Sequence, residues 1–416
     1  MVAKPSSHGP IPPAGIAKVL RSPRGFALVA MLVYLLATLP ILALHRFDAS
    51  IFIVAGDHYV DQSKLISPII VQPHSDGYDG QFYYRMALAP LAFTNPAFGV
   101  RLDNPAWRTQ RIVYPLAAWA AAFGRGDLIP LSLFLVNLLG IGAIALFAAR
   151  LTSLLKLPAF TPLAVMLWPG FIVSLTYDTT EIIACAFLLG ALDVYLRGRI
   201  AGYAVLAALA ALTRETSIVF FVGLFCFELI AAMRSANWQQ SWRRSLLRLI
   251  LTGLALVPFP VWRQLQFVLW AQSLLTDAAR ENVSWPFAGF VDAVAGTMSG
   301  VSFGGGHLAL RTYALAAMAL LAIFCGMVTL RLNGAFRTPR IAPLAAGWLP
   351  LFALMTLLTA PWVQTAFLRA FSECFVVGCL IVASRPPPLW IGRALIVCCA
   401  LAAAASWAIR VESLGF

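Results

Sequence analysis

The stretch LIPLSLFLVNLLGIGAIALFAA, residues 128–149, contains no charged side chain. A helix needs about 20 consecutive, mostly apolar residues to cross the hydrocarbon core of a bilayer, and this stretch meets that length. Uncharged runs of this length are typical of membrane spans and not of the shorter helices that form a soluble core. Residues 128–149 therefore predict a transmembrane helix.

Apolar runs of the same character continue on both sides of this stretch. Together with it they predict about eleven transmembrane helices, and hence an all-α polytopic membrane protein. A further apolar piece, 112–123, is too short to cross alone, and it either lies in the interface or begins the span at 128–149. The other runs lie near residues 26–44, 158–176, 181–196, 201–213, 216–233, 247–270, 309–330, 342–360, 366–383 and 393–410.

The composition indicates the same class. Of the 416 residues, 61% are hydrophobic and 11% are charged, whereas soluble domains are about 45–50% apolar and about 25% charged. The net charge of +13 is not gathered in a basic run, so no nucleic-acid partner is predicted. Five scattered histidines and seven cysteines in apolar segments show no metal-ligand spacing. No cofactor is therefore predicted, and a need for a divalent metal stays open.

Lysine and arginine recur in alternate short loops, which orients the chain by the positive-inside rule. The pattern places the N-terminus in the cytoplasm, with residues 1–24 as a disordered tail and residues 25–416 as a single polytopic membrane domain. Residues 45–111 then form a long first extracytoplasmic loop, and residues 271–308 form a second large outer loop. The glycine run SFGGGH, residues 302–307, predicts a mobile lid in the second loop.

Within the first loop, the segment DGYDGQFYYR, residues 76–85, combines two carboxylates with glycines and aromatic side chains. Asp76 and Asp79 each precede a glycine, which permits a tight turn. Residues 81–89 predict a short helix that lies in the membrane interface and ends at Pro90. Such a helix would hold a carboxylate at the membrane surface, although two Asp-Gly pairs also serve as simple turn signals.

Two turns assigned to the same outer face carry charge between apolar helices. Arg214 and Glu215 follow Thr213, and they either neutralise one another in a lipid-facing turn or leave Arg214 to bind an anionic substrate. Asp178 and Glu181 either supply a second carboxylate to the same pocket or belong to a solvated hairpin. Both turns are therefore candidate parts of a site on the outer face.

Two arginines lie at the end of the first loop. Arg108 and Arg111 precede Tyr114, and arginine beside aromatic side chains at a membrane boundary either binds phosphate or anchors the chain in the interface. We interpret Arg108 as an interfacial anchor and leave both roles open for Arg111.

The order of these features resembles the integral-membrane glycosyltransferases of the GT-C superfamily. The likeness is greatest to PIG-V-like mannosyltransferases and to related bacterial proteins of cell-surface glycopolymer formation. The residues that carry it are YDGQFYY at 78–84, Arg-x-x-Tyr-Pro at 111–115 and Thr-Arg-Glu at 213–215. PIG-V proteins usually have a tryptophan before the acidic residue, where this chain has Tyr78.

The resemblance implies an inverting transfer of a sugar from a polyprenyl-phosphate donor to a lipid-linked or glycan acceptor. The reaction is expected among the lipids of the cell inner (plasma) membrane, at its outer face. Asp79 matches the family's acidic position and is the expected general base, with Asp76 as its neighbour. The expected substrate-binding residues are Arg214, Glu215, Arg111, Tyr83, Tyr84 and Gln81.

Two other classes of protein fit the same composition. A transporter or flippase for a lipid-linked glycan predicts internal repeats and polar residues near the bilayer midplane, and no repeat is evident in this sequence. A non-catalytic assembly protein of an envelope-glycan pathway predicts no converging polar cluster on the outer face. Whether Asp79, Arg111, Arg214 and the 280–307 loop meet in one outward-facing cavity therefore discriminates between these classes.

Overall fold

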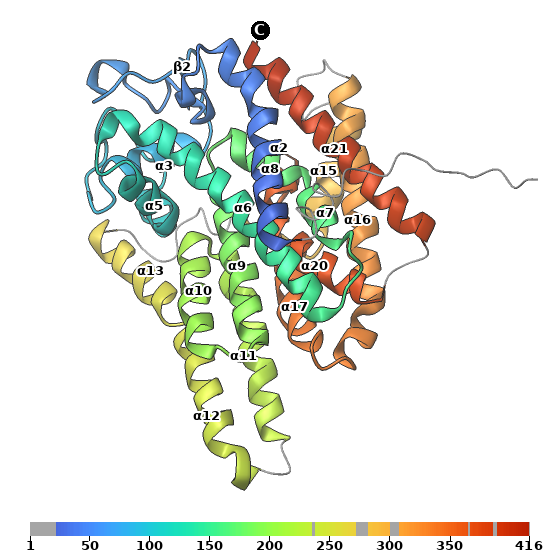
Figure 1. Ribbon diagram of the computed structural model, residues 1–416. Coiled ribbons are helices and arrows are strands. Elements are labelled where there is room, and N and C mark those ends of the chain that lie inside the picture. The colour runs from blue at the N-terminus through green and yellow to red at the C-terminus, as the bar shows by residue number, and fades with distance from the viewer. Residues whose placement is uncertain are drawn as a thin grey trace, which may run out of the picture.

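The computed structural model describes residues 22–234, 238–271, 282–299, 308–364, 367–385 and 389–415. Most of these residues are helical, and the helices form one bundle (Figure 1). The helices are α2 Pro23–Leu44, α3 Gly80–Leu88, α4 Pro105–Thr109, α5 Val113–Ala121, α6 Ile129–Leu155, α7 Thr161–Met166, α8 Pro169–Thr176, α9 Glu181–Leu196, α10 Ile200–Thr213, α11 Thr216–Met233, α12 Trp238–Leu254, α13 Pro258–Leu269, α15 Ala288–Ser299, α16 Leu308–Phe336, α17 Ala342–Thr356, α18 Ala360–Gln364, α19 Phe367–Ala370, α20 Ser372–Ser384 and α21 Leu389–Gly415.

Six helical stretches among the described residues are long and apolar enough to cross a membrane. They are Pro23–Leu44, Gly126–Leu155, Thr216–Met233, Ser245–Leu269, Leu310–Phe336 and Trp390–Val411. On α2, the outward side chains of Leu28, Leu32 and Leu36 are more than half exposed, as contact with lipid requires. The protein is therefore an all-α, multi-pass membrane protein. The count of eleven spans stays a prediction, because helices such as α10, α17 and α20 are shorter.

The predicted span 247–270 is divided between α12 and α13, and two further predicted spans are each divided into two helices. The run 158–176 forms α7 and α8, separated by Trp168, whose backbone is extended. The reason is Pro169, because proline disfavours the helical conformation of the residue before it and removes an N–H donor. The run 366–383 forms α19 and α20 on either side of Phe371. A continuous helix was therefore the wrong prediction for both runs.

The predicted loops also contain more structure than expected. Residues 45–111 hold a parallel pair of two-residue strands, β1 Ala55–Gly56 and β2 Val71–Gln72, three short 3₁₀ or α elements and α3. The second outer loop contains the helix α15. Helix α2 begins at Pro23, within the predicted N-terminal tail. Residues 1–21 and the proposed lid at 302–307 lie outside the described residues.

The amphipathic helix predicted at residues 81–89 forms as α3, but its surroundings differ from the prediction. Every residue from Gly80 to Ala87 is buried, and α3 packs against α5, α6 and β1. Its apolar face therefore contacts protein and not lipid, unlike the face of a helix that lies on a membrane surface. The covering segments are distant in sequence, so the local pattern of α3 could not reveal them.

Close backbone packing fixes the start of α3 against the rest of the bundle. A Cβ atom on Gly80 would lie 2.5 Å from the carbonyl oxygen of Ile53 and 2.7 Å from that of Tyr177. Glycine is therefore required at this position for steric reasons. The contact holds Asp79, the preceding residue, beside the turn that leads from α8 into α9.

Helix α6 forms the centre of this half of the bundle. It packs against α2, α5 and α9, and a Cβ atom on Gly140 would lie 2.7 Å from the side chains of Ile182 and Ile183. The small residue lets the first turn of α9 approach α6 closely. Glu181, the first residue of α9, is consequently buried close to α6 and α3.

Candidate functional site

Asp79 is held by two arginines from different parts of the chain. Its Oδ1 accepts a hydrogen bond from Nη1 of Arg108 at 2.7 Å, and its Oδ2 accepts one from Nη2 of Arg369 at 2.5 Å. Arg108 also donates from Nε and Nη2 to the two carboxylate oxygens of Asp103, at 2.8 and 2.6 Å. Asp79 is thus a fully paired carboxylate at the start of α3.

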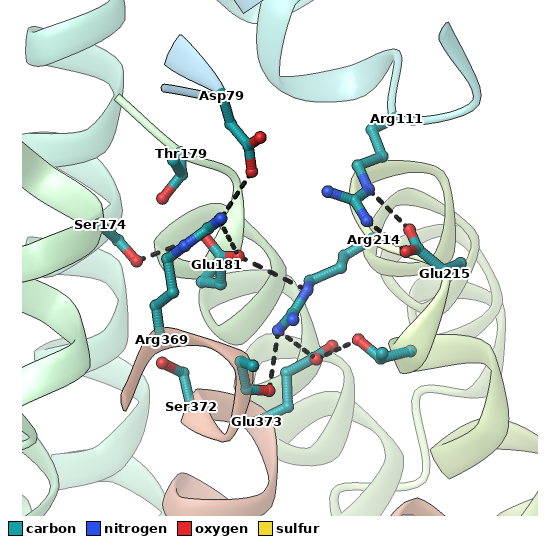
Figure 2. A network of polar contacts seen from close by, with 12 residues as sticks. Asp79, Arg111, Ser174, Thr179, Glu181, Arg214, Glu215, Arg369, Ser372 and Glu373 are labelled. Atoms are coloured by element: carbon teal, nitrogen blue, oxygen red, sulfur yellow. Dashed lines mark hydrogen bonds and ion pairs between the residues drawn. The ribbon is translucent and has the colours of Figure 1, made fainter. Parts of the chain in front are cut away.

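Arg369 links Asp79 to Glu181 in the polar cluster (Figure 2). Besides Asp79, it donates from Nη1 to Oε1 of Glu181 at 2.7 Å and from Nε to the hydroxyl of Tyr78 at 3.0 Å. The Tyr78 ring also lies 4.9 Å from the guanidinium carbon. This one side chain joins the first loop to the bundle, since Glu181 begins α9.

Arg214 extends the cluster toward α20. Its Nη1 donates to Oε2 of Glu373 at 3.0 Å and to the carbonyl of Ala370 at 3.2 Å, and its Nε lies 3.7 Å from Oε1 of Glu181. Glu373 also accepts hydrogen bonds from the hydroxyls of Thr216 and Ser217. Arg214 and Glu373 are both at most 3% exposed, so the pair lies in the protein interior.

Glu215 pairs with Arg111 and not with its neighbour Arg214. Nε of Arg111 donates to Oε2 of Glu215 at 2.8 Å, and Nη2 donates to Oε1. The third nitrogen of Arg111, Nη1, donates to the hydroxyl of Tyr83 at 3.0 Å. The bidentate pair joins the end of the first loop to the start of α11.

Four helices begin at this cluster. Asp79 precedes α3, Glu181 begins α9, Glu215 precedes α11 and Ser372 begins α20. The positive ends of the four helix dipoles therefore point toward one region, where they favour negative charge. This accounts in part for the four carboxylates gathered there, and the same field would favour a phosphate group.

The arginines set the protonation state of Asp79. Burial opposes its ionisation, but Arg108 and Arg369 outweigh burial and hold the pKa of Asp79 below its usual range. Burial likewise raises the pKa of Tyr78 to about 12. Asp79 is therefore ionised at neutral pH and is a weak base for as long as both arginines hold it.

The structure brings five of the predicted site residues into adjoining contacts. Asp79 and Arg214 both contact the Arg369–Glu181 pair, and Arg111, Glu215 and Tyr83 form the neighbouring unit. Two interpretations of these turns were wrong. Arg108 is not an interfacial anchor but a partner of Asp79, and Arg214 is neutralised by Glu373 and Glu181 instead of Glu215.

Glu181 joins the cluster, while Asp178 is buried beside it. The solvated hairpin was the wrong interpretation, since both side chains are fully buried. Oδ1 of Asp178 accepts a hydrogen bond from the Tyr114 hydroxyl at 3.4 Å. Of these two carboxylates, Glu181 is the one that contacts the arginines, as the alternative interpretation expected.

Three other predicted residues lie outside the cluster. Asp76 is exposed over 81% of its side chain and pairs with Nδ1 of His58 at 2.8 Å. Gln81 is buried and its amide is satisfied by backbone, accepting from Gly56 N–H and donating to Asp76 C=O. Tyr84 is fully buried against protein, so its ring has no open face for a sugar.

We expect Asp76→Asn to leave any activity of the cluster within about two-fold of wild type, because the carboxylate faces solvent, where a single ion pair contributes little. Initial-rate measurements on the purified variant check this. A loss approaching that of an Asp79 variant would show that Asp76 acts in the reaction.

Arg369 and Glu373 were missed by sequence reasoning. Both lie within the apolar run 366–383, where ionisable side chains are costly unless they pair or line a site. Their spacing of four residues on a predicted helix was an available signal, since it places both on one face. The cluster thus depends on two residues that the apolar run concealed.

An apolar groove of about 590 Å³ begins next to the cluster. Phe371, which lines it, directly follows Ala370, whose carbonyl accepts from Arg214. The groove lies between α15, α16 and α17, and one of its lining residues is adjacent in sequence to a residue that contacts Arg214. Its other lining residues include Phe287, Phe290, Leu321, Cys325, Phe352 and Val363.

Comparisons with protein-family models, curated proteins and solved structures found no match for this chain. Within the described residues, no three His, Cys, Asp or Glu side chains are grouped so that they could hold a metal ion. The functional argument therefore depends on the geometry of the arginine–carboxylate cluster.

Proposed function

We propose that this protein is an integral-membrane glycosyltransferase of the GT-C type, which moves a sugar from a polyprenyl-phosphate donor to a lipid-linked or glycan acceptor. The observation that carries the proposal is the meeting of Asp79, Glu181, Arg214 and Arg369, from four separate elements, in one buried cluster. A non-catalytic assembly protein requires no such convergence.

The donor phosphate would bind where the arginines and the helix N-termini converge. Phosphate is a better match for guanidinium groups than a single carboxylate oxygen is, because it offers several charged acceptors at once. The polyprenyl chain would follow the apolar groove that begins at Phe371. Both parts of such a donor, charged and apolar, then have matching surfaces in adjoining positions.

The pairing of Asp79 suggests how the donor activates the base. A phosphate that takes over Arg369 removes one of the two guanidinium groups that lower the pKa of Asp79. The pKa then rises, and the carboxylate becomes a stronger base only when the donor is present. Such a mechanism keeps the base inactive toward water in the empty enzyme.

The chemical step is a single displacement. Asp79 accepts the proton of the acceptor hydroxyl, and the hydroxyl oxygen forms a bond to the anomeric carbon. The bond from that carbon to the phosphate oxygen breaks, and its electron pair leaves with the polyprenyl phosphate. Arg214 and Arg369 stabilise the charge on this leaving group.

We place the reaction at the outer face of the cell inner membrane, with the N-terminus in the cytoplasm. This orientation follows the lysine and arginine bias of the short loops. It puts residues 45–111, which carry Asp79, on the side where envelope glycans are assembled.

The proposal is tested with purified protein and a panel of polyprenyl-phosphate sugars, with the corresponding nucleotide sugars as control donors. We expect transfer from at least one lipid donor and from no nucleotide sugar. Transfer from nucleotide sugars at an equal rate would reject the donor class.

The pH dependence of kcat/KM reports the base in the free enzyme. Because the pKa of Asp79 is held below its usual range, we expect no acidic loss of kcat/KM above pH ~5. Arg108→Gln removes one of the two guanidinium groups, so the pKa rises and activity is lost at a higher pH than in wild type. An acidic limb that stays in place in Arg108→Gln would exclude Asp79 as the titrating base.

A further inference from the structure

A further buried arginine, outside the cluster, contacts no carboxylate among the described residues. Arg85, in the last turn of α3, is fully buried. Its Nη2 donates to the carbonyl of Ala92 at 3.0 Å and to that of Thr94. Its Nε and Nη1 have no hydrogen-bond partner in the described structure. Two of its three nitrogens are therefore left without an acceptor.

Two glutamines near this arginine also have buried polar atoms without a hydrogen-bond partner in the described structure. Gln110 and Gln266 are fully buried, and in each the amide oxygen and nitrogen have no hydrogen-bond partner among the described residues. An amide at such a site ordinarily bonds to protein or water, because an unpaired buried polar group costs free energy. Four amide atoms are thus unpaired in addition to the two guanidinium nitrogens.

Contacts of α13 place these side chains at one junction. Trp262 and Trp270 donate from their indole nitrogens to the carbonyl and the Oγ1 of Thr109, at 3.1 and 3.0 Å. Gln266 lies one turn from each tryptophan on that same face of α13. The guanidinium carbon of Arg85 is 5.8 Å from the Trp270 ring, and Gln110 directly follows Thr109.

The junction is separate from the Asp79 cluster. Asp79 precedes α3 and Arg85 is six residues further on, about 9 Å along a helix. No hydrogen bond or ion pair of the described residues joins Arg85 to Asp79, Arg369 or Glu181. Helix α13 lies at the edge of the bundle (Figure 1) and packs against α4 and α10.

The unpaired guanidinium and amide groups at the junction favour an anion as ligand. A buried cation without a counter-ion is costly, and burial lowers the pKa of Arg85 to about 10. Nη2 is already bonded to two carbonyls, so anion oxygens would accept from Nε or from Nη1 singly, since these two nitrogens point to different sides of the guanidinium group. The amides supply donors for further anion oxygens and acceptors for hydroxyl groups.

We propose that Arg85, Gln110 and Gln266 form a second binding site, for a phosphate group, that is distinct from the site of the proposed transferase reaction. Trp270 immediately follows the candidate membrane span Ser245–Leu269. The site thus lies at the end of a span, the level at which phospholipid headgroups are found. The phosphate belongs either to an anionic phospholipid or to a soluble phosphate compound.

The test uses the full-length protein, purified in detergent without phosphate, and follows its thermal unfolding. One arm adds inorganic phosphate, and the other adds phosphatidylglycerol with phosphatidylcholine as the neutral control. We expect the midpoint to rise by a few degrees in at least one arm. A rise with phosphatidylglycerol alone assigns a lipid headgroup, and a rise with inorganic phosphate alone assigns a soluble compound. No rise in either arm overturns the proposal.

Variants decide whether the rise comes from this site. Gln266→Met replaces an unpaired amide by an apolar side chain of similar shape, so without ligand it should unfold at an equal or higher temperature than wild type. With ligand it should bind at least ten-fold more weakly. Arg85→Gln should lose the response altogether, whereas Arg125→Gln, at an exposed arginine paired with Asp127, should keep it. An unchanged response in both Gln266→Met and Arg85→Gln would overturn the proposal, leaving buried water as the partner of these atoms.

Discussion

Asp79→Asn is expected to abolish sugar transfer while the protein remains folded in the membrane. The substitution keeps the shape of the side chain and removes its ability to accept the acceptor's proton. A positioned general base contributes about 10²–10⁴-fold to a rate, so we expect a loss of at least about 100-fold in kcat. The measurement is the initial rate of transfer by the purified variant.

Asp103→Asn is the matched control. Asp103 shares Arg108 with Asp79, but among the described residues it makes no hydrogen bond or ion pair with Arg369 or Glu181. Its loss should perturb Arg108 and leave the proposed base in place, with a rate within about ten-fold of wild type. Equal losses in Asp79→Asn and Asp103→Asn would mean that the cluster, and not a base, limits the rate.

Arg369→Met is expected to be the most destabilising substitution in the cluster. Arg369 is only 3% exposed and pairs with both Asp79 and Glu181. Its removal leaves Glu181 with the longer 3.7 Å contact to Arg214 and the hydrogen bond from the Ser174 hydroxyl at 3.3 Å. Breaking a buried ion pair from one side costs about 3–5 kcal/mol. The measurement is the free energy of unfolding, or the detergent-unfolding midpoint, relative to wild type.

A second substitution distinguishes charge from packing. Arg369→Met combined with Glu181→Gln removes one of the unpaired carboxylates and should recover part of the lost stability. Arg101→Met is the control for loss of an arginine at an exposed position, where only the Tyr59 ring and the His58 carbonyl are contacted. It should change stability by less than about 0.5 kcal/mol. An Arg369→Met variant as stable as Arg101→Met would contradict the role of Arg369 as the link between loop and bundle.

Much of the helical framework follows from hydropathy alone. The run 216–233 has the bounds of α11, and the run 128–149 lies within Gly126–Leu155. The breaks in other runs had local causes, as at Pro169. Length and apolar character thus predict which segments are helical, whereas prolines and non-helical single residues decide where they divide.

The candidate site was predictable only in part. Topology placed Asp79 and Arg214 on one face, and both contact the Arg369–Glu181 pair. The choice between Asp76 and Asp79 depends on the approach of Gly80 to Ile53 and Tyr177, which no local pattern reveals. No role was predicted for Arg85, because its surroundings depend on α13, which is far away in the sequence.

The central claim is tested most directly with wild-type protein reconstituted in liposomes that contain a labelled polyprenyl-phosphate sugar and candidate acceptors. Two readouts are followed together: formation of a new glycosidic bond and movement of the labelled lipid between leaflets. We predict a new glycosidic bond, with release of polyprenyl phosphate, that is absent in Asp79→Asn. Movement of the intact lipid between leaflets, without a new bond and equally in wild type and Asp79→Asn, would contradict the account and identify a transporter.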